Sequence, residues 1–133
     1  MKKIEHIGIA VCNLEKSNLV FKKILGEKHF KEEIVVNQGV KTSFFKIGNS
    51  KIELIAANNS NSTIQKYLSK NKEGMHHLAL HVEDIYKEID RIKKEGIRIL
   101  NKEPELGADN KLICFLHPRD TNGVLIELCQ ERE

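Results

Sequence analysis

The sequence predicts an α+β fold made of two βαβββ repeats, and three observations lead to this prediction. Two strand-like segments, residues 5–11 and 76–82, open in the same way, with a histidine followed by alternating apolar residues. Each is followed by a segment whose apolar residues have helical spacing. Each half then ends on a similar apolar segment that contains a glutamate, residues 51–55 and 125–129. We interpret the chain as an internal duplication whose two copies form one curved mixed sheet.

The first repeat is expected over residues 1–57. An alternating pattern over residues 4–11 has the period of a strand. Asn13 can cap a helix over residues 14–25, and Gly26 provides its stop. Three further strand patterns follow, separated by turn-forming residues, near residues 29–36, 41–47 and 51–57.

Residues 58–74, a polar stretch and a short helix pattern, link the two copies, and residues 75–133 form the second repeat. This repeat opens with a strand over residues 75–82, followed by a helix that Asp84 caps and Gly96 ends. Its remaining strands are expected near residues 97–100, 111–115 and 123–129, with loops at residues 103–110 and 117–123. We therefore expect residues 1–133 to form a single domain.

Composition and charge limit the classes of function. The chain has 133 residues, of which 40% are apolar, enough to build one core without disulfides. The 22 basic residues are nearly balanced by 19 acidic ones, so the sequence does not favour nucleic-acid binding. The first residues, 1–6, reach charged and polar side chains before any apolar run of signal-peptide length, so we expect no signal peptide. No stretch approaches the roughly 20 apolar residues of a membrane span. Three isolated cysteines fit buried thiols in a reducing compartment, and we expect a cytoplasmic protein.

Four potential metal ligands occur as symmetric pairs, because each repeat has a histidine near its start and a glutamate near its end. Two imidazoles and two carboxylates suit a divalent first-row cation or zinc, with coordination positions left for substrate oxygens. In the predicted strands all four point away from the apolar face, toward the same side of the sheet. The four residues are His6, Glu53, His77 and Glu127.

A structural role is the alternative for each of these residues taken singly. A lone histidine on a strand is more often solvated or hydrogen-bonded than a ligand, and a glutamate in an apolar strand is often paired. The recurrence of all four at matching positions of the repeats favours the metal site.

Several segments together resemble one known family over nearly the whole chain. They are EHIGIAV at residues 5–11, KIELI at 51–55, EGMHHLAL at 73–80 and FLHPRDTNGVLIE at 115–127. The chain resembles the vicinal oxygen chelate superfamily and, within it, the methylmalonyl-CoA epimerases. The resemblance implies tandem βαβββ units forming a cleft around a metal, commonly in a homodimer. It also implies that the metal ligands are His6, Glu53, His77 and Glu127.

The activity that the resemblance implies is the metal-dependent epimerisation of methylmalonyl-CoA, with an acyl-CoA as substrate. The cofactor would be a divalent ion such as cobalt, manganese or zinc. Glu53 and Glu127 are the candidate catalytic residues, because they come from equivalent places in the two copies and could carry protons on opposite faces of the substrate.

Residues 38–40, Gln-Gly-Val, form a turn that also belongs to the resemblance. The chain departs from some relatives of the family, which have an added carboxylate in the strand after this turn. Here that strand carries Lys41, Thr42 and Ser43, and Glu32 and Glu33 are possible substitutes. Two other functions stay open. One is a glyoxalase-like lyase acting on a thiol adduct, and the other is a metal-free small-molecule binding protein of the same fold.

Overall fold

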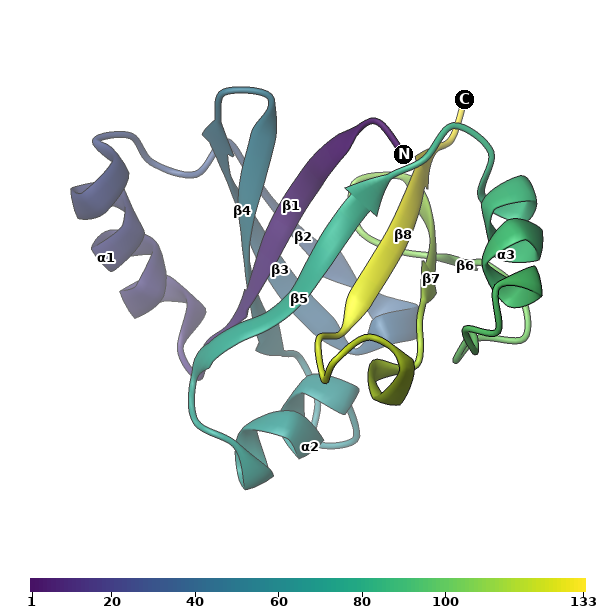
Figure 1. Ribbon diagram of the computed structural model, residues 1–133. Helices are drawn as coiled ribbons and strands as arrows, with labels where there is room; N and C mark the ends of the chain where they lie inside the picture. Colours follow the sequence, from purple (N-terminus) through teal and green to yellow (C-terminus); the bar gives the residue numbers. More distant parts are fainter. The chain divides into compact units, whose positions relative to one another are not determined.

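A computed structural model of the protein describes residues 1–133 and contains the two predicted copies of βαβββ (Figure 1). The first copy consists of β1 (Lys3–Ala10), α1 (Leu14–Leu25), β2 (Lys31–Val35), β3 (Val40–Ile47) and β4 (Ser50–Ala57). After α2 (Thr63–Lys70), the second copy consists of β5 (Gly74–His81), α3 (Ile85–Lys94), β6 (Glu105–Leu106), β7 (Lys111–Phe115) and β8 (Ile126–Glu131). Two short 3₁₀ helices, η1 (Val36–Gln38) and η2 (Pro118–Asp120), lie in connections. The predicted α+β class and element order are confirmed.

The chain divides into two compact units that do not coincide with the two copies. One unit is Ile7–His76, and the other combines Met1–His6 with His77–Glu133. Strands β1 and β5 therefore each give one part to each unit. The hydrogen-bonded strand order is β2-β3-β4-β1-β5-β8-β7-β6. It is a mixed sheet, because β5 and β8 are parallel whereas β2, β3 and β4 pair in antiparallel fashion. The predicted repeat boundaries and the single domain stay predictions.

The core of the unit Ile7–His76 lies between α1 and the strands. Asn13 caps α1 as predicted, because its side chain accepts a hydrogen bond from the Lys16 backbone N–H. Gly26 ends the helix in the left-handed conformation, with φ of 82°. The apolar side of α1 packs on β3 and β4 in a cluster that includes Leu14, Phe45 and Leu54.

The other unit has an equivalent core on α3. Asp84 caps this helix by accepting from the Lys87 N–H at 3.1 Å. The helical spacing of its isoleucines places them against β7 and β8. Figure 1 shows α3 beside these strands. The buried cluster comprises Val82, Ile85, Ile89, Ile92, Cys114, Leu116 and Leu128. A second, smaller cluster joins Ala79, Ile113 and Cys129, with Phe115 packed against it.

The strand predicted near residues 97–100 is wrong, because this segment makes only an isolated bridge between Ile99 and Leu116. Side chains compete for the backbone groups that would extend the pairing: Asn101 Oδ1 accepts from the Phe115 N–H, and Asp120 accepts from the Arg98 N–H. The short strand β6 forms instead, within the segment predicted as a loop, by pairing with β7. Strand β8 begins at residue 126 rather than 123.

The three cysteines differ in exposure. Cys114 and Cys129 are buried as predicted, whereas Cys12 is exposed because it lies in the turn between β1 and α1.

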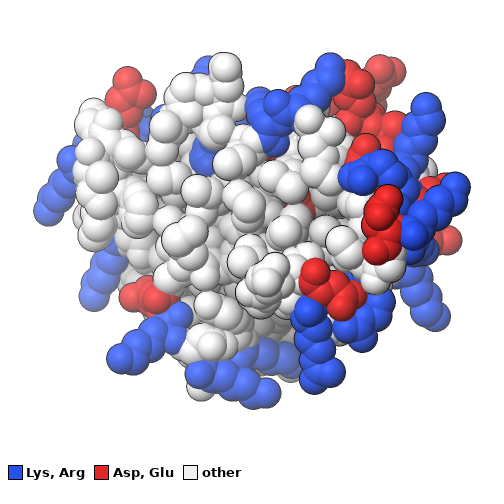
Figure 2. Space-filling model, viewed as in Figure 1, with Lys and Arg blue, Asp and Glu red and all other residues white.

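Charges of both signs are mixed on the surface. On the face drawn in Figure 2, acidic side chains lie beside basic ones. Ion pairs such as Arg91–Glu88 and Lys2–Glu83 illustrate this mixing. No helix has both the length and the apolar character needed to cross a membrane.

Candidate metal site

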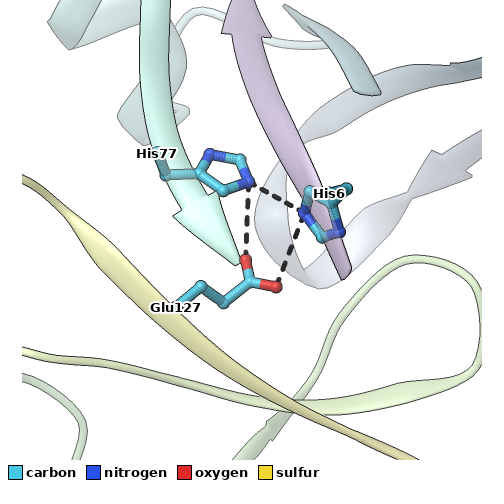
Figure 3. A group of neighbouring side chains, drawn as sticks. All are labelled: His6, His77 and Glu127. Atoms are coloured by element: carbon cyan, nitrogen blue, oxygen red, sulfur yellow. Dashed lines mark hydrogen bonds and ion pairs between the residues drawn. The ribbon is translucent and has the colours of Figure 1, made fainter. Parts of the chain in front are cut away.

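Three of the four predicted ligands come together within one unit of the protein. His6 is on β1, His77 on β5 and Glu127 on β8. One potential ligand atom from each residue lies within 4.8 Å of the others. Figure 3 shows the two imidazoles and the carboxylate pointing toward one another. All three residues are among the four that the sequence singles out, and the structure brings their side chains together.

Strand pairing explains why these three side chains meet. The Lys2 backbone N–H donates to the His81 carbonyl at 3.0 Å, which joins the start of β1 to the end of β5. Four residues further along β1 is His6, and four residues back along β5 is His77. On the other side of β5, Ala79 is the register partner of Glu127. Because alternate residues of a strand share a face, Glu127 lies on the His77 side of the sheet.

The distances suit a single cation. His6 Nε2 and His77 Nε2 are 3.0 Å apart. The Glu127 oxygens lie 3.7 Å from His6 Nε2 and 3.6 Å from His77 Nε2. Ligand atoms about 2.0–2.2 Å from one zinc-like ion are separated from each other by roughly 3–3.5 Å. The donor set therefore fits a divalent cation with only small side-chain adjustments.

Burial makes this group of polar side chains unusual. His6, His77 and Glu127 are 6%, 5% and 5% exposed. Removing a carboxylate and two imidazoles from water is costly unless they are paired or bind a metal. Next to Glu127, the register partners are the small Ala79 on β5 and Phe115 on β7. The Phe115 ring also meets the His77 ring edge to face, with centroids 6.1 Å apart, and so fixes one side of that imidazole.

Glu53, the fourth predicted ligand, lies on β4 in the unit Ile7–His76 and is 4% exposed. Its register partner is Phe44 on β3. Thr42, two residues before Phe44, shares this face of the sheet and is 1% exposed. The Thr42 hydroxyl is buried without a hydrogen-bond partner. A hydroxyl therefore occupies the position on β3 that neighbours Glu53 on this face.

The two substitute carboxylates lie on opposite faces of β2. Glu33 is the register partner of Thr42, and Glu32 is the partner of Ser43. Side chains directly opposite each other share a face, so Glu33 lies on the face of Thr42 and Glu53. The Glu33 side chain is 28% exposed and pairs with Lys31 at 3.5 Å. Of the two, Glu33 is the better placed substitute.

One residue beside the site was not singled out from the sequence. Glu5, next to His6, is 2% exposed, and its Oε1 lies 3.4 Å from His6 Nδ1. A comparison of the two copies gives the missing signal. The first histidine is preceded by an acid, whereas His77 is preceded by another histidine, His76.

Comparison with known proteins agrees with the fold. Residues 5–115 match the model of the Glyoxalase/Bleomycin resistance protein/Dioxygenase superfamily. The chain is 40% identical to the mitochondrial methylmalonyl-CoA epimerase of Homo sapiens, over 96% of this chain and 73% of that protein. It is 38% identical to the ethylmalonyl-CoA/methylmalonyl-CoA epimerase of Cereibacter sphaeroides, over 96% of this chain and 97% of that protein.

A solved structure has the same fold. The chain superimposes on a Streptomyces coelicolor methylmalonyl-CoA epimerase variant in complex with 2-nitronate-propionyl-CoA with a TM-score of 0.93. The two chains are 34% identical, and the match covers 98% of each.

Proposed function

Because the chain belongs to the Glyoxalase/Bleomycin resistance protein/Dioxygenase superfamily and, within it, to the methylmalonyl-CoA epimerases, we propose that it interconverts (2R)- and (2S)-methylmalonyl-CoA. The protein is then an isomerase of the racemase and epimerase class. The observation that carries the proposal is the buried group of His6, His77 and Glu127, whose donor atoms are spaced for one cation. An acyl-CoA substrate is supported by the 2-nitronate-propionyl-CoA bound to the similar S. coelicolor enzyme.

We propose that His6, His77 and Glu127 hold the cation, with Glu53 as the fourth ligand. Glu53 is included because it occupies the place in the first copy that Glu127 occupies in the second. Mixed nitrogen and oxygen donors suit cobalt, manganese or zinc. When bound, a divalent cation supplies Lewis-acid stabilisation of negative charge on the substrate carbonyl oxygens.

The protein residues must then move one proton. The α-carbon of methylmalonyl-CoA lies between a thioester and a carboxylate, so its proton is acidic. Inversion at this carbon needs a base on one face and an acid on the other. We assign these roles to Glu53 and Glu127. Thr42 has no acidic group to contribute, and Glu33 is the next candidate because it shares the sheet face of Glu53.

Solvent deuterium exchange tests the activity directly. Methylmalonyl-CoA is incubated with the cobalt-loaded protein in deuterium oxide, and mass spectrometry follows the α-position. We expect deuterium to enter from either epimer, and Glu127→Gln and Glu53→Gln to slow exchange by roughly 10²–10⁴-fold. Glu88→Gln is the matched control, because Glu88 pairs with Arg91 on α3 away from the site. No exchange in the cobalt-loaded wild-type protein would exclude the epimerase.

A lyase acting on a thiol adduct would use the same ligands, since both reactions remove a proton next to a carbonyl. Turnover of the methylglyoxal–glutathione adduct without exchange into methylmalonyl-CoA would favour the lyase. A metal-free binding protein is distinguished by metal analysis after purification without chelator. Absence of a stoichiometric divalent ion, and no activity on adding cobalt or manganese, would favour that third function.

We also expect the protein to form a homodimer. The expectation follows from the family resemblance. Light scattering coupled to gel filtration gives the mass in solution, and a value near the 15.3 kDa of one chain would contradict a stable dimer.

A further inference from the structure

Glu5 is a buried carboxylate that the proposed chemistry does not use. It is 2% exposed, and it lies outside the group of three residues whose donor atoms converge. An ionised carboxylate is costly to bury unless hydrogen bonds or opposite charges compensate for the lost water. The position of Glu5 therefore requires a reason, and its contact with His6 provides one.

The contact joins Glu5 to the side of the His6 ring that faces away from the other two ligands. Glu5 Oε1 lies 3.4 Å from His6 Nδ1. The opposite ring nitrogen, His6 Nε2, lies 3.0 Å from His77 Nε2 and 3.7 Å from Glu127 Oε2. A carboxylate can only accept a hydrogen bond, so Nδ1 must carry the hydrogen in this contact. In the neutral ring, Nε2 then carries the lone pair.

We propose that Glu5 is a positioning residue that holds His6 in the Nδ1–H tautomer and so presents the Nε2 lone pair to the cation. The inference rests on the cation site of the proposed function. Carboxylates that accept from the outer nitrogen of a ligand histidine fix its tautomer and orientation and make it a better ligand.

The second copy orients its histidine by different means. The residue before His77 is His76, whose ring packs against Tyr67 with centroids 4.8 Å apart. The His77 ring instead meets the Phe115 ring edge to face. The two copies therefore carry equivalent imidazoles, and a carboxylate lies beside only the first of them. Loss of Glu5 should weaken the site through His6 and leave the His77–Phe115 contact intact.

Metal affinity of Glu5→Gln tests the proposal. The variant keeps the size of the side chain and removes its charge. The dissociation constant for zinc or cobalt is measured by competition with a chromophoric chelator, without any assay of activity. We expect affinity to fall by about 10–100-fold, the usual cost of removing such a partner. Glu88→Gln, which removes the carboxylate that pairs with Arg91 in the same unit, should leave affinity unchanged. A metal affinity of Glu5→Gln within about twofold of wild type would overturn the proposal, because the loss would then be smaller than the expected 10–100-fold.

The tautomer itself gives a second, independent measurement. In the metal-free wild-type protein, ¹⁵N chemical shifts of the imidazole nitrogens report which nitrogen carries hydrogen. We expect His6 to be protonated on Nδ1, and this population to decrease in Glu5→Gln. A His6 ring protonated mainly on Nε2 would overturn the proposal even if Glu5→Gln failed to fold. If wild type binds no metal while Glu5 still controls the tautomer, the cation site is wrong and the contact alone stands.

Discussion

The reactivity of individual side chains in this protein depends on whether they reach water, and the three cysteines illustrate the range. Cys12 is exposed, whereas Cys114 and Cys129 are both 0% exposed. Burial raises the pKa of the Cys114 thiol to about 11, because the charged thiolate loses its hydration. The thiolate is the reactive form, so burial and the raised pKa both protect Cys114.

We therefore expect a thiol reagent such as DTNB to modify Cys12 in the native protein and all three cysteines after unfolding in guanidinium. Cys12→Ser is the control, and it should abolish the reaction of the native protein at pH 8. Rapid modification of Cys114 or Cys129 in native Cys12→Ser would show that the core around β7 and β8 opens readily.

At this scale the sequence could predict which side chains come together but not every contact between them. His6, His77 and Glu127 were predictable because their positions repeat, and the structure brings them together. The contact between Glu5 and His6 was not predictable, because neighbouring residues of an ideal strand point to opposite faces. Only the actual side-chain conformations show that the two groups meet.

Single elements are held in place by side chains from distant parts of the chain. The segment before β6 is an example, since Arg98 binds Asp120 of η2 through both its side chain and its backbone N–H. These hydrogen bonds from Arg98 hold the pKa of the Asp120 carboxyl well below its usual range. The Arg98 pKa is raised by the same pair.

The lowered pKa of Asp120 predicts a pH dependence of stability. Because its folded pKa is below its unfolded value of about 3.9, the pair stabilises the protein above that pH. The stabilisation is lost as pH falls toward the folded pKa. We expect Asp120→Asn to unfold at lower urea concentration than wild type at pH 7, and the difference to shrink below about pH 4. Asp90→Asn, on the exposed side of α3, is the control and should show no such trend.

Helices and long strands were the elements that sequence predicted best, because local signals define them. Asn13 and Asp84 cap α1 and α3 as expected. The strand expected near residues 97–100 failed for a reason that is not local. Asn101 and Asp120 accept from backbone N–H groups around this segment, and both contacts depend on the tertiary fold.

For the whole molecule, a cation bound by β1, β5 and β8 would link metal binding to the free energy of unfolding. A ligand that binds only the folded state adds about 2.7 kcal/mol to the free energy of unfolding when its free concentration is about 100 times its dissociation constant. For a domain of this size that corresponds to a rise in Tm of roughly 8–12 °C. We expect this rise when zinc or cobalt is added to chelator-treated protein, measured by calorimetry or circular dichroism.

His77→Ala provides the matched variant for this measurement. The variant should remain folded, since His77 is not a member of the hydrophobic core clusters of this unit. Its Tm should not change when metal is added. A variant that unfolds even without metal would show that His77 is mainly structural. An equal rise in wild type and His77→Ala would place the bound metal elsewhere.

The sequence could predict the order of the strands along the chain but only part of their pairing. The duplication predicted equivalent copies, and the element order follows it. It did not predict that β1 and β5 would each be divided between two compact units. That division depends on pairing between strands far apart in sequence, such as β5 with β8, for which no local pattern exists.

The division at His6 and His77 also bears on the order in which the protein can form during synthesis. Residues 7–76 are one continuous stretch, so this unit can fold as soon as it leaves the ribosome. Residues 1–6 belong with residues 77–133 and stay without their partners until those residues have been made. Because His6 is on β1 and Glu127 is on β8, segments that are translated at different times meet in this group of side chains. Metal capture by His6, His77 and Glu127 should therefore follow the synthesis of β8.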